Sequence, residues 1–269
     1  MEILLNALYK GGVAKTTQNF IFANLLARKG YRVLFLDFDP QMNGTMLLTG
    51  MEKNDDEFKE KNIYKAIEED NMEANILNVK ENIDIVPGSK IVNLFEDLMV
   101  EKEIKQFHLY FKILLEDIAN QEVYDFVLMD MGPAKSKLNT AVMATATAHI
   151  VITQAEVLSM DNIQEYIEDI EELKEYGAEG KILGIAVGMQ NNSKINLSVV
   201  EAIKEAYPEL VFNTIIKRRT RLQEYALTGF PEETIRGTYA KEDSNALRLH
   251  IKLLAEVLGR LNVLETEEV

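Results

Sequence analysis

The stretch Lys10-Gly11-Gly12-Val13-Ala14-Lys15-Thr16-Thr17 decides the fold, because it joins two segments of different hydrophobic pattern. Residues 3–8 are almost all apolar and predict a buried strand, whereas residues 16–29 predict a helix that ends at Gly30. A second apolar run, residues 32–38, predicts another strand. A strand–loop–helix–strand unit of this length predicts a right-handed parallel crossover.

The same stretch has the composition of a phosphate-binding loop. Glycines between a strand and a helix let backbone N–H groups converge on phosphate oxygens, and the helix start adds its positive dipole end. A lysine at the helix start neutralises phosphate charge and the next hydroxyl binds magnesium, so Lys15 and Thr16 are the candidates. Tyr9 and Ala14 stand where the general pattern requires glycine, so the loop departs from that pattern twice.

Alternating strands and helices continue along the chain and predict an α/β fold. We expect one domain, residues 1–269, with a mostly parallel sheet covered by helices on both faces. Residues 50–81 are highly charged, and we expect loops and short helices there, over one sheet edge. Further strands are expected at residues 82–87, 126–130, 148–153, 182–189 and 211–217, and helices at 93–120, 160–176 and 245–261.

The last of these helices is predicted to pack against the core. Its Leu247, Ile251, Leu254, Leu258 and Leu261 repeat at helical spacing, which indicates one buried face.

Composition excludes several classes of site. The chain has no cysteine, which excludes disulfides, thiolate catalysis and Cys-ligated metal centres and fits a cytoplasmic location. Its three histidines are scattered without ligand spacing, and we expect His108, His149 and His250 on helix faces or a strand edge. No apolar stretch reaches the ~18 residues that a membrane span needs. The formal net charge is −15, so nucleic-acid binding would require a local basic patch.

Two acidic segments follow predicted strands. Asp37-Phe38-Asp39-Pro40-Gln41 comes at the end of the second strand, and the apolar run 126–129 ends at Asp130. In open α/β sheets, ligands bind at the carboxyl ends of the strands. The three acids are therefore expected beside the glycine-rich loop.

Together these motifs resemble the ParA/MinD family of ATPases, a branch of the P-loop fold with a deviant phosphate loop. The resemblance spans nearly the whole chain and implies hydrolysis of ATP with Mg2+. It implies that Lys10 reaches across a sandwich dimer to the partner's ATP, and that Asp39 orients the attacking water. Lys15 joins them as a catalytic residue. ATP contacts are implied for Gly11, Gly12, Val13, Ala14, Lys15, Thr16 and Thr17, and Thr16, Asp37 and Asp130 are implied at the metal.

The adenine pocket is implied at the segment from Thr214 to Leu222, which resembles another family motif. Lys217 replaces the family's proline, and Arg219 replaces its asparagine. We therefore assign Lys217 and Arg219 to the nucleotide pocket, with Gln190 and Asn191, which follow a strand end, as further candidates.

The branch of the family is suggested by local charge. Lys217, Arg218, Arg219 and Arg221 place four positive charges in five residues. Such a cluster could neutralise phosphates, so Lys217, Arg218 and Arg221 are predicted to bind non-specific DNA. The resemblance then implies a DNA-partition ATPase that associates with the nucleoid when ATP-bound and responds to a centromere-binding adaptor. The residues before Lys10 are too few for a helix-turn-helix domain, which argues against sequence-specific binding.

Three alternatives stay open. A membrane-cycling, MinD-like positioning ATPase would carry a basic amphipathic helix at its end, whereas this sequence ends in acidic residues that disfavour a membrane partner. Amidoligase-type metabolic relatives share the fold, but no substrate motif supports them here. A scaffold that only binds nucleotide is disfavoured because both lysines and all three acids are present.

Overall fold

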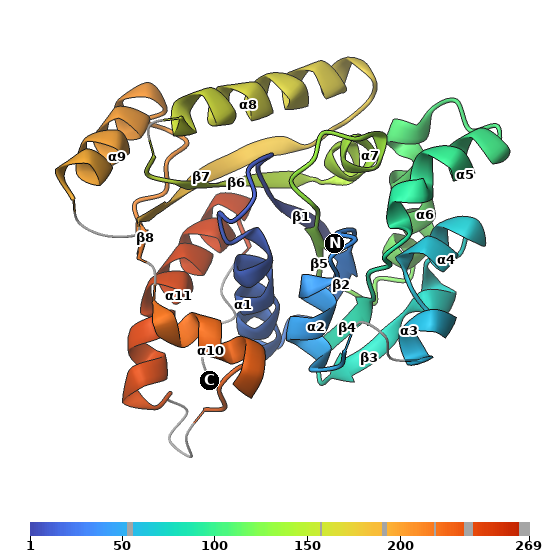
Figure 1. Ribbon diagram of the computed structural model, residues 1–269, viewed down its shortest axis with the longest axis horizontal. Coiled ribbons are helices and arrows are strands. Elements are labelled where there is room, and N and C mark those ends of the chain that lie inside the picture. Colours follow the sequence, from blue (N-terminus) through green and yellow to red (C-terminus); the bar gives the residue numbers. More distant parts are fainter. Residues whose placement is uncertain (53–55, 157, 190–192, 218, 234–238, 264–269) are drawn as a thin grey trace.

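One sheet organises the molecule in a computed structural model that describes residues 1–52, 56–156, 158–189, 193–217, 219–233 and 239–263. Its strand order is β3-β4-β2-β5-β1-β6-β7-β8 (Figure 1). All neighbouring strands are parallel except the β3–β4 pair. The strands are β1 (Glu2–Ala7), β2 (Val33–Asp37), β3 (Leu77–Lys80), β4 (Ile83–Val86), β5 (Phe126–Asp130), β6 (Ala148–Gln154), β7 (Lys181–Met189) and β8 (Ile216–Lys217).

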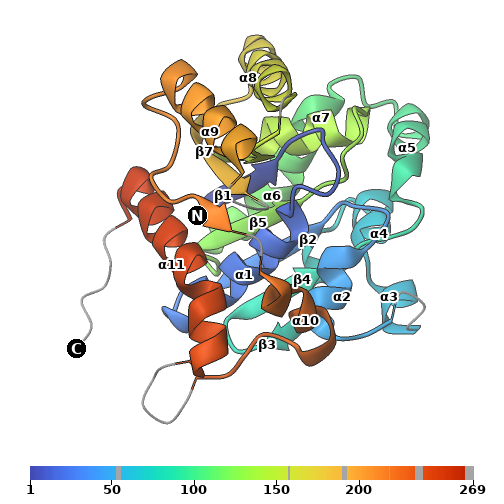
Figure 2. The same ribbon diagram turned by 60° about the vertical axis from the view of Figure 1, so that its left-hand side comes forward.

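Helices cover both faces of this sheet, as predicted. In Figures 1 and 2, α1 and α11 lie on one face, while α7 and α8 lie on the other. The α-helices are α1 (Lys15–Arg28), α2 (Asn43–Thr49), α3 (Asp56–Glu60), α4 (Ile63–Glu68), α5 (Phe95–Glu101), α6 (Tyr110–Asn120), α7 (Lys137–Thr145), α8 (Ser159–Glu175), α9 (Lys194–Ala206), α10 (Thr220–Thr228) and α11 (Lys241–Leu261). Short 3-10 turns occur at η1 (Glu73–Asn75), η2 (Val92–Leu94) and η3 (Phe107–Leu109).

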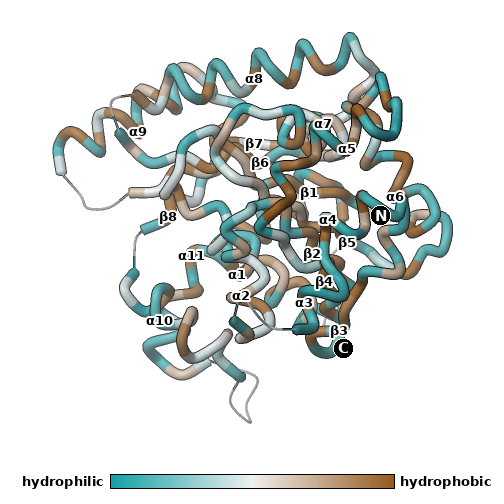
Figure 3. The backbone as a smooth tube through the Cα atoms, turned by 45° about the vertical axis from the view of Figure 1, so that its right-hand side comes forward, coloured by the Kyte–Doolittle hydropathy of each residue, from teal (hydrophilic) through white to brown (hydrophobic). Residues whose placement is uncertain are grey.

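The central strands are buried along their whole length. Every residue of β2 and of β5 is buried, and the hydrophobic segments of Figure 3 gather in the middle of the molecule. Strands of a parallel sheet that is covered on both faces are expected to be continuously apolar, because neither face meets water. In this register Asp37 lies beside Asp130, at the carboxyl ends of β2 and β5.

Two strand predictions were wrong in part. Of the predicted strand 211–217, only Ile216 and Lys217 (β8) form a strand. The N–H groups of Asn213 and Thr214 donate to the Glu256 carboxylate (2.7 and 2.9 Å) and are therefore not available for pairing with β7. Val211 makes a single isolated bridge. Within residues 50–81 the expected short helices are present, but β3 is also there, as a half-exposed antiparallel edge strand whose mixed sequence gives a weak signal.

Details of the helices and histidines also differ from expectation. In α11, Leu247 and Leu254 are buried as predicted. Ile251 is exposed, however, and the neighbouring His250 is buried instead. His149 lies in β6, which is an interior strand between β1 and β7 rather than an edge. No helix in the described ranges is long and apolar enough to cross a membrane.

Candidate functional site

The turn between β1 and α1 leaves the start of α1 without a side-chain cap. Gly12 and Ala14 both have positive φ, of 77° and 74°, which bends residues 11–14 over the start of α1. No side chain caps this helix and no acid lies in its first turn. The first N–H groups of an uncapped helix attract anions. The turn is fixed to β6 by Gln154, whose Nε2 donates to the Gly12 carbonyl (2.8 Å).

The Lys15 side chain lies beneath this turn. Its Nζ donates to the carbonyls of Leu8 and Lys10, each at 2.9 Å. The side chain is buried, and burial lowers the pKa of Lys15, while the charges of Asp130 and Asp39 oppose this shift. The ammonium is therefore held inside the phosphate loop by weak neutral acceptors, which a phosphate could replace.

The Lys10 side chain takes the opposite direction. Its Nζ forms an ion pair with the Glu156 carboxylate, in the loop after β6. The preceding residue, Tyr9, is anchored to α8, because its hydroxyl donates to Asp169 Oδ2 (2.5 Å). The two lysines of the loop therefore have different surroundings, one interior and one at the rim.

Asp37 and Asp39 hold the segment that follows β2. Asp37 Oδ2 accepts hydrogen bonds from the backbone N–H and hydroxyl of Thr45 (2.8 and 2.7 Å), and its Oδ1 accepts from Asp39 N (3.1 Å). Burial raises the pKa of Asp37 to about 6. Asp39 Oδ1 in turn accepts from Gln41 N (2.8 Å). Asp37 thus fixes both the loop that presents Asp39 and the start of α2.

Asp130 is completely buried at the end of β5. Its Oδ1 accepts from Asn19 Nδ2 (3.0 Å), and Asn19 Oδ1 accepts from Asn6 Nδ2 (2.6 Å), which makes a buried chain of amides behind the carboxylate. Burial, then the neighbouring charge of Asp37, raises the pKa of Asp130 to about 8, while hydrogen bonding by Thr16 and Asn19 opposes this. Asp130 Oδ2 has no hydrogen-bond partner among the described residues.

A cavity of about 850 Å³ lies against Lys15, Thr16 and Asp39. This volume lies in the usual range for small-molecule sites. The cavity is lined by residues 11–18, by Asp39, and by parts of α2, β6, β7, α10 and α11. Lys217 and Arg219, predicted at the adenine end, line the same cavity. The candidates Gln190 and Asn191, and the predicted DNA contact Arg218, lie outside the described residues.

The comparisons with known proteins agree with this geometry. A family model described as an AAA domain matches residues 1–181. The chain belongs to this family. More specifically, it is a P-loop ATPase of the ParA/MinD type, with ATP and Mg2+ as its cofactors.

Relatives of this ATPase include proteins that are named for sporulation or for chromosome partitioning. The sporulation initiation inhibitor protein Soj of Bacillus subtilis is 26% identical over 226 residues, which cover 82% of this chain and 86% of that protein. The chromosome-partitioning ATPase Soj of Thermus thermophilus is 29% identical over 218 residues, 80% of each chain. A variant of McdA from Cyanothece, solved as an ATP complex, superposes with a TM-score of 0.80 at 21% identity over 100% of this chain and 99% of that one.

The donor set fits magnesium bound partly through water. No group of three or more His, Cys, Asp or Glu side chains in the part described could hold a metal by itself. The Thr16 side chain instead hydrogen-bonds to Asp130. Asp130 Oδ2 is a buried carboxylate oxygen without a hydrogen-bond partner among the described residues, so it is available as a ligand. Mg2+ keeps several waters and takes few protein ligands when phosphates complete its shell. In this ATPase Thr16 and Asp130 would hold the ion, which would neutralise phosphate charge.

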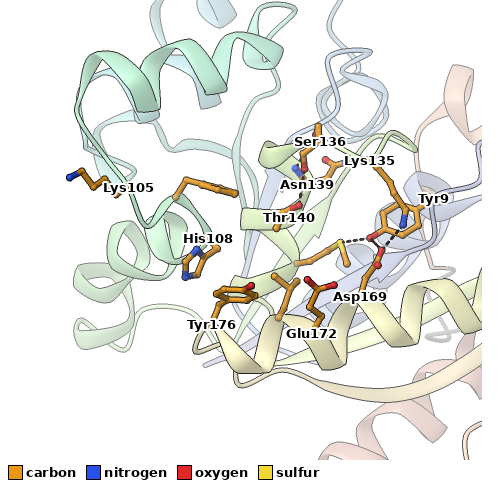
Figure 4. Close-up of a pocket in the computed structure, with 13 residues that line it drawn as sticks. Tyr9, Lys105, His108, Lys135, Ser136, Asn139, Thr140, Asp169, Glu172 and Tyr176 are labelled. Atoms are coloured by element: carbon orange, nitrogen blue, oxygen red, sulfur yellow. Dashed lines mark hydrogen bonds and ion pairs between the residues drawn. The ribbon is translucent and has the colours of Figure 1, made fainter.

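A second cavity, of about 510 Å³, lies on the other side of Tyr9, between η3, α7 and α8 (Figure 4). Its charged groups include Lys135, which contacts Asp169 (2.9 Å) and lies over the Tyr9 ring, 4.6 Å from its centroid. Among the described residues, the two cavities have no lining residue in common. The second cavity is therefore separate from the ATP site, and the Asp169 and Lys135 side chains on its wall hold Tyr9, which precedes the phosphate loop.

Sequence reasoning missed several residues of this site. Asn19, Gln18 and His250 lie at or behind the cavity wall, and Glu156 pairs with Lys10. A signal for two of them was present in the sequence, because Gln18 and Asn19 are adjacent amides just inside an otherwise apolar helix. Polar residues that are buried in a helix need partners, which here come from β5 and α11.

Proposed function

We propose that this chain is a DNA-partition ATPase, one ATPase domain whose ATP-bound dimer binds DNA without sequence preference and is released by hydrolysis. The contrast between its two loop lysines carries the proposal. Lys15 faces its own phosphate loop, whereas the Lys10 ammonium lies at the rim, against Glu156. A rim lysine of this kind is available to an ATP molecule bound in a second copy, as the resemblance implies.

Hydrolysis would proceed by in-line attack of water on the terminal phosphate. Catalysis in this class comes from positioning and charge neutralisation. Lys15, Lys10 and magnesium would carry the charge, with Thr16 and Asp130 at the ion. Asp39 would orient the water, and Asp37, whose oxygens already accept three hydrogen bonds, would hold Asp39 in place near the ion.

Non-specific DNA binding is proposed for the exposed cations at the cavity rim. Lys217 is exposed, and Arg218 is its neighbour in sequence. Arg221 differs from them, because its guanidinium bonds Asp243 Oδ1 and Glu224 Oε2, both at 2.7 Å. Its charge is therefore compensated inside the fold, and any part it plays in DNA binding would come through the placement of α10.

The proposed partners are a second copy of the chain, DNA and a centromere-binding adaptor that stimulates hydrolysis, with no membrane partner. The location that follows is cytoplasmic and nucleoid-associated. Chromosome partitioning is the activity that the Thermus thermophilus relative carries in its name, and the same cycle is proposed here.

The test is retention of the protein on non-specific duplex DNA at low salt with ATP, ADP or no nucleotide. We expect retention with ATP alone, and expect Lys217→Ala to weaken it. Because Lys217 also lines the nucleotide cavity, ATP is kept saturating, so that lost retention reports lost DNA binding. Lys181→Ala is the matched control, because Lys181 is an exposed lysine at the start of β7, at the end of the strand away from the site. Absence of ATP-dependent retention in the wild type would refute the partition proposal. ATP-dependent pelleting with anionic liposomes would favour the MinD-like alternative.

A further inference from the structure

The Tyr9 side chain connects the start of the phosphate loop to α8. Tyr9 stands where the general phosphate-loop pattern has glycine, so this connection is a property of this chain and not of the pattern. Its hydroxyl donates to Asp169 Oδ2 (2.5 Å), and its ring packs on the Tyr166 ring, with 5.5 Å between the centroids. Burial, then the hydrogen bond to Asp169, raises the pKa of Tyr9, so the hydroxyl keeps its proton and remains the donor.

The same carboxylate oxygen also holds a second loop. Lys135 lies in the loop between β5 and α7, and its Nζ donates to Asp169 Oδ2 (2.9 Å). Because Lys135 Nζ also lies over the Tyr9 ring, the three side chains form one cluster (Figure 4). Asp169 therefore joins the residue before the phosphate loop to the loop that follows Asp130.

Tyr9 lies between the two backbone groups that hold Lys15. The Lys15 ammonium binds the carbonyls of Leu8 and Lys10, which are the two chain neighbours of Tyr9. An anchored Tyr9 side chain therefore fixes both acceptors. The anchor comes from α8, which lies on the sheet face opposite α1, the helix that carries Lys15.

The loop between β5 and α7 lies at the nucleotide cavity. Its Met131 and Pro133 line that cavity. A Cβ at Gly132 would lie 3.6 Å from Asp39 Oδ1, so the backbone of this loop is close to the acid that we expect to orient water. A shift of the loop would therefore change the surroundings of Asp39.

Stability alone is a weak reason for this cluster. The side chains of Asp169 and Lys135 are 29% and 50% exposed, and ion pairs of such exposure contribute little to the free energy of unfolding. A small misplacement of groups at a reacting centre can by contrast slow an enzyme about a hundredfold. The arrangement of the cluster therefore points to a role in geometry.

We propose that Asp169 is a positioning residue that holds the phosphate loop and the loop after β5 as one unit, through Tyr9 and Lys135. Lys15, whose acceptors flank Tyr9, then keeps a fixed placement relative to Asp39 during hydrolysis. The inference rests on ATP hydrolysis and on the proposed role of Asp39, and not on DNA binding. A negative result in the DNA-retention test would therefore leave it intact.

A double-mutant cycle on ATP hydrolysis by the full chain tests the proposal. Tyr9→Phe keeps the ring and removes the hydroxyl, and Lys135→Met keeps the length of the side chain and removes the ammonium. Each should lower kcat by about tenfold, the effect of one hydrogen bond to a charged group. The double variant should lose no more than either single variant, because one break already separates the two loops. Affinity for ADP, measured by calorimetry, should persist in all three variants.

Tyr110→Phe is the matched control. The Tyr110 hydroxyl also donates to an aspartate, Asp70 Oδ1, at the same 2.5 Å, but Tyr110 lines neither of the two cavities. This variant should lose stability in urea as Tyr9→Phe does, without a change in kcat.

Four outcomes would overturn the proposal. Independent losses that multiply in the double variant would show that the two loops are held separately. Equal losses of kcat and of ADP affinity would mean that the site as a whole is disturbed. An unchanged kcat in both single variants would remove the positioning role, and a loss of kcat in Tyr110→Phe equal to that in Tyr9→Phe would assign the effect to general destabilisation.

Discussion

Glu156 holds the Lys10 ammonium at the rim of the phosphate loop. Both side chains are partly exposed, at 31% for Lys10 and 42% for Glu156, and an ion pair of this exposure contributes about 0–1 kcal/mol. If Lys10 crosses to a partner's ATP, this contact competes with dimerisation. Glu156→Gln should therefore strengthen the ATP-dependent dimer by up to roughly fivefold, measured by sedimentation equilibrium with a non-hydrolysable ATP analogue.

Glu165→Gln is the matched control for this substitution. Glu165 contacts Lys135 (2.8 Å) rather than Lys10, so its replacement removes a similar charge without releasing the loop lysine. A dimer that becomes weaker in Glu156→Gln would contradict the idea of competition, because Glu156 would then assist Lys10.

Replacing Lys10 and Asp39 should separate assembly from chemistry. Lys10→Ala is expected to lose both ATP-dependent dimerisation and hydrolysis, because the proposed contact of Lys10 with the partner's ATP would be removed. Asp39→Ala should keep the dimer and slow hydrolysis by roughly a hundredfold or more, as expected when a group that orients the nucleophile is removed. Sedimentation and phosphate release, measured on the same samples, report the two properties. Loss of the dimer in Asp39→Ala would show that the loop after β2 is needed for assembly.

The strongly apolar strands and the motif positions were predictable from the sequence. Phe126–Asp130 was predicted with its observed bounds, because every residue before the acid is apolar and the sheet is covered on both faces. The neighbourhood of Lys15, Asp39 and Asp130 followed from the rule that the ends of parallel strands meet at one edge. These signals are local and do not depend on which elements pack together.

What the sequence could not predict depends on distant partners. The strand expected from Val211 is interrupted because Glu256, more than forty positions away, takes two of its N–H groups. Likewise, the inward turn of His250 depends on Gln18 of another helix. Period and propensity cannot reveal such contacts, because they describe one segment at a time and do not say which distant segment packs against it.

Ala14 is strained at a position where the general phosphate-loop pattern has glycine. It adopts φ of 74° at the N-cap of α1, in the left-handed region that a Cβ disfavours. Ala14→Gly removes a cost of roughly 1–2 kcal/mol and adds back less than 1 kcal/mol of freedom in the unfolded chain. We expect a net gain of about 0.5–1 kcal/mol in the free energy of unfolding, measured by urea denaturation. A loss of stability would mean that the Ala14 methyl group packs usefully.

Asn19 should tune the affinity for magnesium through Asp130. Asn19→Leu removes the donor to Asp130 Oδ1, which helps to fix the orientation of this carboxylate. Loss of such a supporting hydrogen bond usually weakens metal binding about 10–100-fold. Titration of Mg2+ into the ADP-saturated protein measures this. Asn24→Leu makes the same replacement at another buried asparagine of α1, which bonds Phe20 O (2.8 Å), and should leave Mg2+ affinity unchanged. Equal effects in both variants would assign the loss to general destabilisation.

His149 should make the protein less stable in mild acid. It is buried in β6 with Nδ1 2.9 Å from Tyr166 Oη, and burial lowers its pKa to about 3. An unfolded histidine has a pKa of about 6.5, so the unfolded chain takes up the proton first and stability falls as pH drops below that value. Between pH 7 and pH 5 this one group should remove roughly 2 kcal/mol of unfolding free energy.

Urea denaturation at the two pH values measures that loss. His149→Asn has no titrating ring and should lack this part of the pH dependence, whereas Tyr166→Phe removes the hydrogen bond but keeps the buried imidazole and should retain it. The absolute stability of both variants is expected to fall at pH 7, since each leaves one buried partner unpaired. The difference between pH 7 and pH 5, rather than either value alone, therefore identifies His149 as the proton-linked group. Equal slopes in the wild type and His149→Asn would place the acid sensitivity elsewhere, first of all at the other buried imidazole, His250.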